Sequence, residues 1–439
     1  MTGFSGRADE PRDLLDGVAS AASLRTALVV TGSELVRGDR TDLDGPFLAR
    51  SLVGLGLEPA RITIVGDAVE ELEAALRDGL THDLLITSGG LGPTHDDRTV
   101  ELLARAAGRE LHVDPELVAE IEARSRAVAE RLRRPYTDFE PGVRKQALVP
   151  EGGLVVGLAG TAPALVLEAG SCVAVVMPGP PRELQELWPR ALETEPLRRL
   201  LARTEAPERR VLRFYGVGES SVAAALAAAG GDGDGVEATI CARDFEIHVD
   251  LLVAPGAEAR ADALEQALVE PVEPYLFGRT EASIQELVLA ACRERGLTLA
   301  TAESCTGGMV AARLTSIAGS SDVFVGGVVS YADAVKAAEL EVPESLLREH
   351  GAVSPEVAEA MAAGARRRLG ADVAVSVTGV AGPGGGTPEK PVGLVYLHAA
   401  GPDGAERHAD LHLPGDRATI RTRATVAALH LVRRLVTEL

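Results

Sequence analysis

Two glycine-rich segments in the last third of the chain carry hydroxyl groups where a strand should end. Residues 303–308 (ESCTGG) leave a predicted strand and enter a helix, and residues 376–391 (SVTGVAGPGGGTPEKP) leave another. Side chains at such turns are exposed at the carboxyl edge of a parallel sheet, where ligands bind in α/β folds. The segment 318–336, which lies between them, adds further polar residues. The side chains that could act at this edge are Ser304, Ser321, Tyr331 and Lys336.

These residue types together could hydrolyse an amide. A neutral lysine or a tyrosinate would activate a serine hydroxyl, and backbone N–H groups of the glycine-rich loops would receive the oxyanion. We therefore expect the polar loops to converge on one cleft. The spacing is equally compatible with serines that cap helices and a solvated Lys336. Cys305 has only His350 near it in sequence, and a buried small residue is its better interpretation.

A second candidate site lies near the N-terminus, in residues 88–97 (SGGLGPTHDD), again between a predicted strand and a helix. Its glycines permit close backbone approach, and the free N–H groups at the start of the next helix suit a phosphate. Asp96 and Asp97 could hold a divalent cation that bridges this phosphate. The alternative is that one of these aspartates caps the helix and the glycines only form the turn.

The elements that position these segments follow from hydrophobic periodicity. Residues 25–110 alternate apolar runs with helical patterns, which predicts a parallel sheet covered on both faces. A charged break at 203–209 precedes a small α+β unit over 210–277, with an acidic loop, GGDGDG, at 230–235. Ser283 and Glu286 form a capping-box pattern that opens a second α/β domain.

Composition narrows the function classes. The chain has 439 residues, 65 acidic against 44 basic side chains, a net charge of -21 and 46% hydrophobic residues. A disordered chain is excluded, and the charge argues against nucleic acid or an anionic membrane as the main partner. Four scattered cysteines suggest neither a disulfide framework nor a zinc site. We find no apolar run long enough to span a membrane and no secretory signal, so we expect a cytoplasmic protein.

At this point the motifs resemble one family over nearly all of residues 25–439, the competence/damage-inducible protein A (CinA) family. The motifs that carry the resemblance are SGGLGPTHDDRT, VVMPGPPREL, GVGES, TAESCTGG, AGSSDVF, VSYADAVK, HGAVS, TGVAGPGGGTPEKPVG and GDRATIR. The chain departs from the family pattern at Asp42-Leu43-Asp44, where Asp-Thr-Asn is usual, at 157–164 (GLAGTAPA), where the family reads Asn-x-x-Gly-Thr-Ala-Pro-Gly, and at Ala332-Asp333, where Ser-Asn is usual.

We interpret residues 1–24 as a flexible tail from their composition alone. For the rest of the chain the resemblance implies three regions: a molybdopterin-binding-like three-layer α/β domain (25–203), a KH-like α+β module (204–277) and an α/β CinA-type amidohydrolase domain (278–439). KH domains bind RNA through a basic loop, whereas the loop here is acidic, so we interpret this module as structural and expect no nucleic acid partner.

The activity that the resemblance implies for the C-terminal domain is deamidation of nicotinamide mononucleotide (NMN) to nicotinic acid mononucleotide and ammonia, in pyridine nucleotide salvage, with no cofactor. Ser304, Ser321, Tyr331 and Lys336 fall on the family's catalytic pocket. The implied substrate-binding residues are Thr306, Gly307, Gly308, Thr378, Gly379, Gly382, Arg417 and Arg421.

For the N-terminal domain, the resemblance implies a metal-dependent ADP-ribose pyrophosphatase. The implied phosphate loop is Gly89, Gly90, Gly92 and Thr94, with a divalent metal at Asp96 and Asp97. The family also favours a homodimer. A third hypothesis is a non-catalytic nucleotide-binding protein linked to competence or DNA damage.

Overall fold

The computed structural model describes residues 24–439, and the chain divides into two compact units at Glu208/Arg209. The tail expected over 1–24 therefore lies, apart from Leu24, outside the described residues. The boundary between the units falls a few residues after the expected 203/204. No helix in the described part of the chain is both long and apolar enough to cross a membrane.

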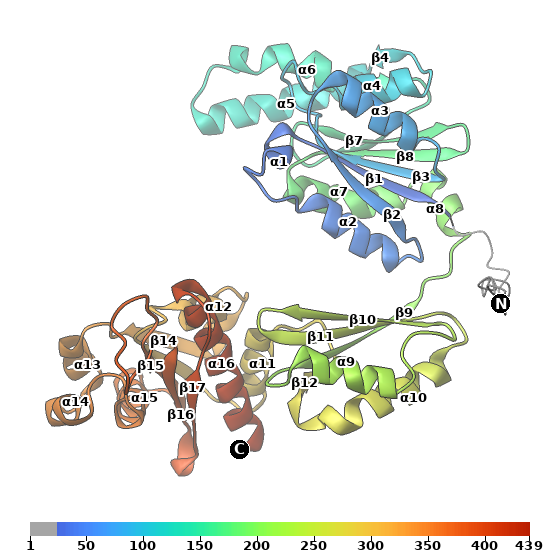
Figure 1. Ribbon diagram of the computed structural model, residues 1–439. Coiled ribbons are helices and arrows are strands. Elements are labelled where there is room, and N and C mark those ends of the chain that lie inside the picture. The colour runs from blue at the N-terminus through green and yellow to red at the C-terminus, as the bar shows by residue number, and fades with distance from the viewer. Residues whose placement is uncertain (1–23) are drawn as a thin grey trace, which may run out of the picture. The chain divides into compact units, whose positions relative to one another are not determined.

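The first unit is built on a six-stranded sheet in the order β2-β1-β3-β8-β7-β6 (Figure 1). The strands are β1 (Thr26–Thr31), β2 (Pro59–Val65), β3 (Leu84–Ser88), β6 (Leu154–Leu158), β7 (Pro163–Ala169) and β8 (Cys172–Met177). The first three and β8 are parallel, as expected. However, β7 and β6 run antiparallel, because β7 turns directly back into β8 without a crossover helix.

Helices cover both faces of this sheet, which gives the expected three layers. One face packs on α2 (Asp44–Val53), α7 (Pro181–Leu192) and α8 (Glu195–Leu201). The other packs on α3 (Val69–Gly79), α4 (Thr99–Ala106), α5 (Pro115–Leu132) and α6 (Glu140–Gln146). The short α1 (Ser33–Val36) and the two-stranded sheet of β4 (Leu111–Val113) and β5 (Leu148–Pro150) complete the unit. Strand β1 is buried along its whole length, as a central strand between two helical layers must be.

The second unit begins with a small α+β module, as the residue pattern predicted. Its sheet has the order β10-β11-β9-β12, made of β9 (Glu208–Phe214), β10 (Val236–Arg243), β11 (Glu246–Val253) and β12 (Leu276–Gly278). Helices α9 (Glu219–Ala228) and α10 (Glu258–Val269) pack on the same core.

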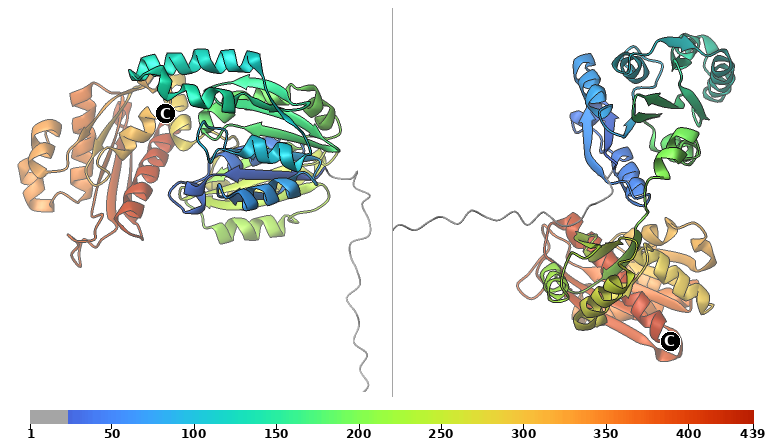
Figure 2. Two further views of the ribbon diagram at one scale, coloured as in Figure 1. Left: turned by 90° about the horizontal axis from the view of Figure 1, so that it is seen from above. Right: turned by 90° about the vertical axis from the view of Figure 1, so that its right-hand side faces the viewer.

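The rest of the unit is a three-layer domain around the sheet β14-β13-β15-β16-β17. Its strands are β13 (Leu299–Glu303), β14 (Phe324–Val329), β15 (Val373–Gly379), β16 (Leu394–Ala400) and β17 (Glu406–His412). Helices α11 (Ile284–Glu294), α12 (Met309–Thr315) and α16 (Arg417–Glu438) cover one face. Helices α13 (Asp333–Leu340), α14 (Glu344–His350) and α15 (Pro355–Leu369) lie on the other. The terminal helix α16 is red in Figures 1 and 2.

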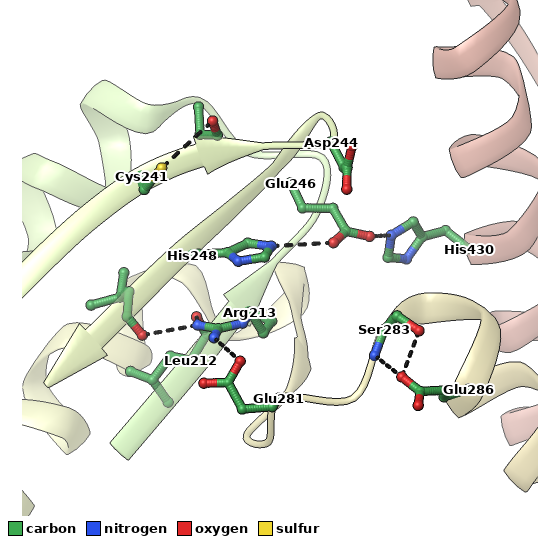
Figure 3. A network of polar contacts seen from close by, with 12 residues as sticks. Leu212, Arg213, Cys241, Asp244, Glu246, His248, Glu281, Ser283, Glu286 and His430 are labelled. Atoms are coloured by element: carbon green, nitrogen blue, oxygen red, sulfur yellow. Dashed lines mark hydrogen bonds and ion pairs between the residues drawn. The ribbon is translucent and has the colours of Figure 1, made fainter. Parts of the chain in front are cut away.

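The α+β module and this domain share a buried polar contact (Figure 3). His430 Nε2 lies 2.7 Å from Glu246 Oε1, and the other carboxylate oxygen of Glu246 lies 3.4 Å from His248 Nε2. The His430 ring stacks on Tyr215 at 3.7 Å between centroids and meets the edge of Phe277. The capping box expected at Ser283 and Glu286 is confirmed and opens α11. The module is therefore joined to the C-terminal domain by a buried hydrogen bond and ring packing.

Candidate active site in the C-terminal domain

The carboxyl ends of β13, β14 and β15 bring three loops to one edge of the sheet. In the sheet, Glu303 of β13 lies beside Val329 of β14 and beside Val377 of β15. The residues that follow these three positions therefore lie close together at the carboxyl edge. Ser304 follows β13, and its N–H donates to the Val377 carbonyl. Most of the chemistry-bearing residues named from sequence lie at this edge.

Glu303 determines the shape of the first loop. Its buried carboxylate accepts hydrogen bonds from the N–H groups of Gly308 (2.9 Å), Val310 (3.1 Å) and Ala311 (2.9 Å). The loop turns into α12 through two left-handed residues, Gly307 and Gly308, a backbone conformation that glycine adopts without strain. The start of α12 is thus occupied by a carboxylate of the chain itself, so the Gly308 N–H is not free to receive an oxyanion.

Lys336 is a buried amine at this edge, with only 1% of the residue exposed, and is not the solvated charge of the alternative interpretation. Its Nζ lies 3.0 Å from the Ser330 carbonyl oxygen and 3.3 Å from that of Tyr331. Asp333 Oδ1 lies 3.6 Å away and is exposed. Burial lowers the pKa of Lys336, against the opposing charge of Asp333. Burial thus makes the neutral amine easier to form than in a solvated lysine. In that form its two N–H bonds can go to the two carbonyls, and its lone pair can accept a proton.

Tyr331 lies on the open side of the same edge, 60% exposed. Its hydroxyl accepts a hydrogen bond from Arg417 Nη2 at 2.9 Å, and Arg417 Nη1 donates to the Gly382 carbonyl at 2.8 Å. Arg417, at the start of α16, thereby connects the loop that follows β15 with the loop that follows β14. The arrangement places a phenol and a guanidinium side by side at the rim.

The second arginine named from sequence, Arg421, supports the first loop. Its Nε donates to the Cys305 carbonyl and its Nη2 to that of Thr306, at 3.0 and 2.8 Å. The Thr378 hydroxyl donates to the Ala352 carbonyl. By contrast, Thr306 Oγ1 and Ser330 Oγ are buried without a hydrogen-bond partner in the structure. Cys305 is buried as predicted, and burial raises the pKa of its thiol to about 11, so it is a thiol rather than a thiolate.

The structure does not bring Ser321 to this edge. Ser321 lies in a short 3-10 helix, Ser320–Asp322, which precedes β14, whereas Tyr331 and Lys336 follow it. Because β13 and β14 are parallel, Ser321 lies at the amino end of the sheet and Ser304 at the carboxyl end. The segment 318–321 precedes a strand instead of following one, so its place at the opposite edge was readable from the strand order.

The N-terminal glycine-rich loop lines a cavity of about 860 Å³ in the first unit. Gly89, Gly90, Gly92, Thr94, Asp96 and Asp97 all contribute to it. Neither aspartate caps the following helix, because α4 starts at Thr99 after Arg98. Asp97 Oδ2 instead accepts a hydrogen bond from the Thr94 N–H at 2.8 Å, which closes the loop on itself. Within residues 24–439, no group of three or more His, Cys, Asp or Glu side chains is placed to hold a metal ion.

One further residue of this cavity was not among the sequence candidates. Asp44 is 5% exposed, its Oδ2 accepts a 2.6 Å hydrogen bond from Ser88, and its Oδ1 is buried without a partner. Burial raises the pKa of Asp44 to about 6, although the Ser88 hydrogen bond lowers it. In the sequence, the feature that could have identified Asp44 as a site residue is the departure at 42–44 from the family's Asp-Thr-Asn.

Comparisons with known proteins agree with this architecture. A family model described as the CinA C-terminal domain matches residues 281–436, and one described as a probable molybdopterin binding domain matches residues 27–198. The chain is 44% identical over 424 residues to a CinA-like protein of Mycolicibacterium gilvum (strain PYR-GCK), covering 94% of this chain and 98% of the relative. It is 45% identical over 428 residues to one of Mycobacterium sp. (strain MCS), covering 95% and 100%.

Among solved structures, the competence/damage inducible protein CihA from Agrobacterium tumefaciens is 41% identical with a TM-score of 0.34, and covers 36% of this chain and 99% of that one. The resemblance inferred from the motifs is confirmed by the full-length relatives and by both family models. The chain belongs to the CinA family, with a probable molybdopterin-binding domain followed by a CinA C-terminal domain.

Proposed function

We propose that the C-terminal domain is an amidohydrolase that converts NMN and water to nicotinic acid mononucleotide and ammonia. The observation that carries the proposal is Lys336, a buried amine held by two carbonyl acceptors at the edge where the polar loops meet. A desolvated lysine is a suitable base for a serine nucleophile. Membership of the CinA family supports the same activity.

The reaction divides into two steps. A serine Oγ–H gives its proton to Lys336 Nζ, and the Oγ forms a bond to the carboxamide carbon. When the tetrahedral intermediate collapses, the C–N bond breaks, and the nitrogen takes the proton from Lys336 and leaves as ammonia. Water then adds to the acyl-serine with the same base, which releases the carboxylate product and restores the serine hydroxyl.

The rim of the site suits the other end of the substrate. Arg417 and the Tyr331 hydroxyl lie together on the open side, 2.9 Å apart. A guanidinium can pair with phosphate oxygens through two N–H bonds, and the phenol can donate a further one. We assign the substrate phosphate to Arg417, because its guanidinium is exposed at the rim beside the Tyr331 hydroxyl, whereas Arg421 is less exposed and holds two loop carbonyls.

Ammonia release from NMN by the full chain tests this proposal. Lys336→Met should reduce the rate by at least about a hundredfold, the usual range for loss of general-base catalysis. Lys145→Met, which changes a lysine of the first unit, should leave the rate unchanged. The proposal fails if the wild-type chain releases no ammonia, or if folded Lys336→Met retains full activity.

The acid-lined cavity of the first unit favours a second candidate, hydrolysis of ADP-ribose. Its glycine-rich loop offers close backbone approach to a diphosphate. Asp96 and Asp97 would supply one or two carboxylates to a divalent cation, and phosphate oxygens of the substrate and water would complete its ligands. Phosphate release from ADP-ribose, followed with a coupled phosphatase, should require Mg²⁺ and disappear in Asp97→Asn. Activity that survives both chelator and this variant would exclude the metal-dependent reaction.

A further inference from the structure

Asp44 is a buried carboxylate in the wall of the first unit's cavity, and one of its two oxygens has no partner. The residue is 5% exposed and lines the cavity together with the glycine-rich loop 88–97. Its Oδ2 accepts a hydrogen bond from the Ser88 hydroxyl at 2.6 Å, whereas its Oδ1 is buried without a partner in the chain. A carboxylate oxygen that is removed from water without a donor is unfavourable, so a ligand that supplies a donor at this point would be bound more tightly.

The carboxylate of Asp44 is not needed to hold the start of helix α2. Asp42 does this instead, because its Oδ1 accepts hydrogen bonds from the N–H groups of Asp44 at 2.9 Å and of Gly45 at 3.1 Å. Among the described residues, Ser88 is the one group that donates a hydrogen bond to the Asp44 carboxylate. A purely structural role therefore accounts for one oxygen of Asp44 and leaves the other without a purpose.

The glycine-rich loop beside Asp44 offers a place for an anion. Gly90, Leu91 and Gly92 line the cavity, and their N–H groups have no acceptor within residues 24–439. Successive backbone N–H groups of this kind form concavities in which phosphates bind. Asp96 and Asp97 lie on the same loop, where a divalent cation would offset the charge of the phosphates.

The distance between these two features indicates which part of a ligand meets Asp44. Ser88, whose hydroxyl contacts Asp44, is separated from Gly90 by one residue, so the Cα atoms of Ser88 and Gly90 are at most about 7 Å apart. In a ribose 5-phosphate the ring hydroxyls and the phosphate are separated by a similar distance, whereas the hydrogen-bonding edge of a nucleobase lies one ring further away. The cavity, of about 860 Å³, is large enough for a nucleotide.

We propose that Asp44 is a specificity-determining residue of this cavity, and that its Oδ1 accepts a hydrogen bond from a ribose hydroxyl of a ligand whose diphosphate lies against the loop 88–97. This inference rests on the second candidate function, because it assigns a contact for the substrate of that reaction. An amine would satisfy Asp44 equally well, but it would leave the N–H groups of the loop without an acceptor. A ribose diphosphate satisfies both.

Two probes that differ only in the ribose hydroxyls test this assignment. We would titrate α,β-methylene-ADP, whose P–C–P bridge resists hydrolysis, and its 2′,3′-dideoxy counterpart into the full chain, with Mg²⁺ present, and follow binding by calorimetry. At about pH 8 Asp44 is a carboxylate, since its pKa is about 6. For the wild type, loss of the hydroxyls should weaken binding about 10- to 100-fold, the range for a hydrogen bond to a charged group. Asp44→Ala should bind both probes with nearly equal affinity.

Two further variants separate the hydrogen bond from a change of shape or of overall charge. Asp44→Asn keeps the shape and can form only a neutral hydrogen bond with the hydroxyl, so it should retain a preference of about 2- to 10-fold for the hydroxyl probe. Asp39→Ala removes an exposed carboxylate that does not line the cavity, and it should keep the full preference.

The inference is overturned if the wild type binds neither probe or binds both equally tightly. It is also overturned if folded Asp44→Ala keeps the full preference for the hydroxyl probe. If the preference depends on Asp44 but the chain does not hydrolyse ADP-ribose, the candidate activity fails while the assignment of Asp44 stands.

Discussion

His430 Nε2 lies 2.7 Å from Glu246 Oε1, across the boundary between the α+β module and the C-terminal domain. Burial lowers the pKa of His430, so the neutral ring donates its N–H to the carboxylate. The stack on Tyr215 fixes the ring plane and therefore the direction of this donor. The module is attached to the C-terminal domain by a titratable contact.

Replacing His430 should therefore destabilise the second unit. His430→Phe keeps the ring stack but removes a hydrogen bond to a buried carboxylate, a loss of about 2–3 kcal/mol. Urea unfolding at pH 7.5 measures the change, and His408→Phe, at an exposed histidine, should cost little. In the wild type, the pKa of His430 is lower in the folded chain than in the unfolded chain. The stabilisation that His430 provides is therefore present above about pH 6.5. It is lost as the pH falls further, because the ring takes up a proton in the unfolded chain before it does so in the folded chain. A flat stability between pH 8 and 5 would contradict the assignment.

Glu303 should stabilise both the loop that follows β13 and the start of helix α12. Glu303→Gln keeps the shape of the side chain but replaces one acceptor oxygen by an amide NH₂ group that faces a backbone N–H group, which should cost about 2–3 kcal/mol and displace Ser304. Thermal unfolding and ammonia release should fall together. Glu344→Gln, at the exposed start of α14, is the matched control and should change neither.

Much of this site could be predicted from the sequence because strand ends have strong local signals. The glycines and hydroxyls after β13 and β15 marked loops at a carboxyl edge, and the capping box at Ser283 fixed the start of α11. The alternation of periods predicted the layers correctly. Local signals suffice where a feature depends on a few neighbouring residues.

What could not be predicted depends on contacts distant in sequence. Lys336 is buried because α13 folds back over the carbonyls of Ser330 and Tyr331, which no periodicity reveals. Strand β17 (Glu406–His412) was not among the predicted strands, because its position at the edge of the sheet leaves its sequence with few apolar residues. Ser321 was assigned to the site from its residue type and from the family resemblance, and the structure places it before β14, at the opposite edge of the sheet from Lys336 of the same chain.

The contribution of Asp44 to the stability of the first unit should be larger at low pH than at high pH. Its pKa is raised to about 6, so its contribution is fully present below about pH 4 and is lost as the pH rises through 6. Asp44→Asn keeps an acceptor for Ser88 and removes the buried charge. It should stabilise the unit at pH 8 by up to about 3 kcal/mol, and by almost nothing at pH 4. Asp39→Asn, at an exposed position, is the control; an equal effect there would refute the explanation.

Arg417 should govern affinity for the phosphate more than turnover. Arg417→Gln removes a charged donor and its bond to Tyr331, and KM for NMN should rise about 10- to 100-fold with a smaller change in kcat. Nicotinamide riboside, which lacks the phosphate, should show the same kcat/KM with both enzymes. A parallel loss on both substrates would instead indicate that Arg417 acts only by holding the loops together.

Asp333 should set the pH at which Lys336 becomes an effective base. The rate of ammonia release should rise with pH, since only the neutral amine accepts a proton, and burial brings this limb below the ordinary pKa of lysine. The exposed carboxylate of Asp333, 3.6 Å away, opposes this lowering by stabilising the charged amine. Asp333→Asn should therefore shift the ascending limb of kcat/KM to lower pH. Glu339→Gln removes a carboxylate of the same helix that pairs with Arg368 instead, and its profile should match the wild type. If Asp333→Asn moves the limb to higher pH, or not at all, the group that titrates is not Lys336.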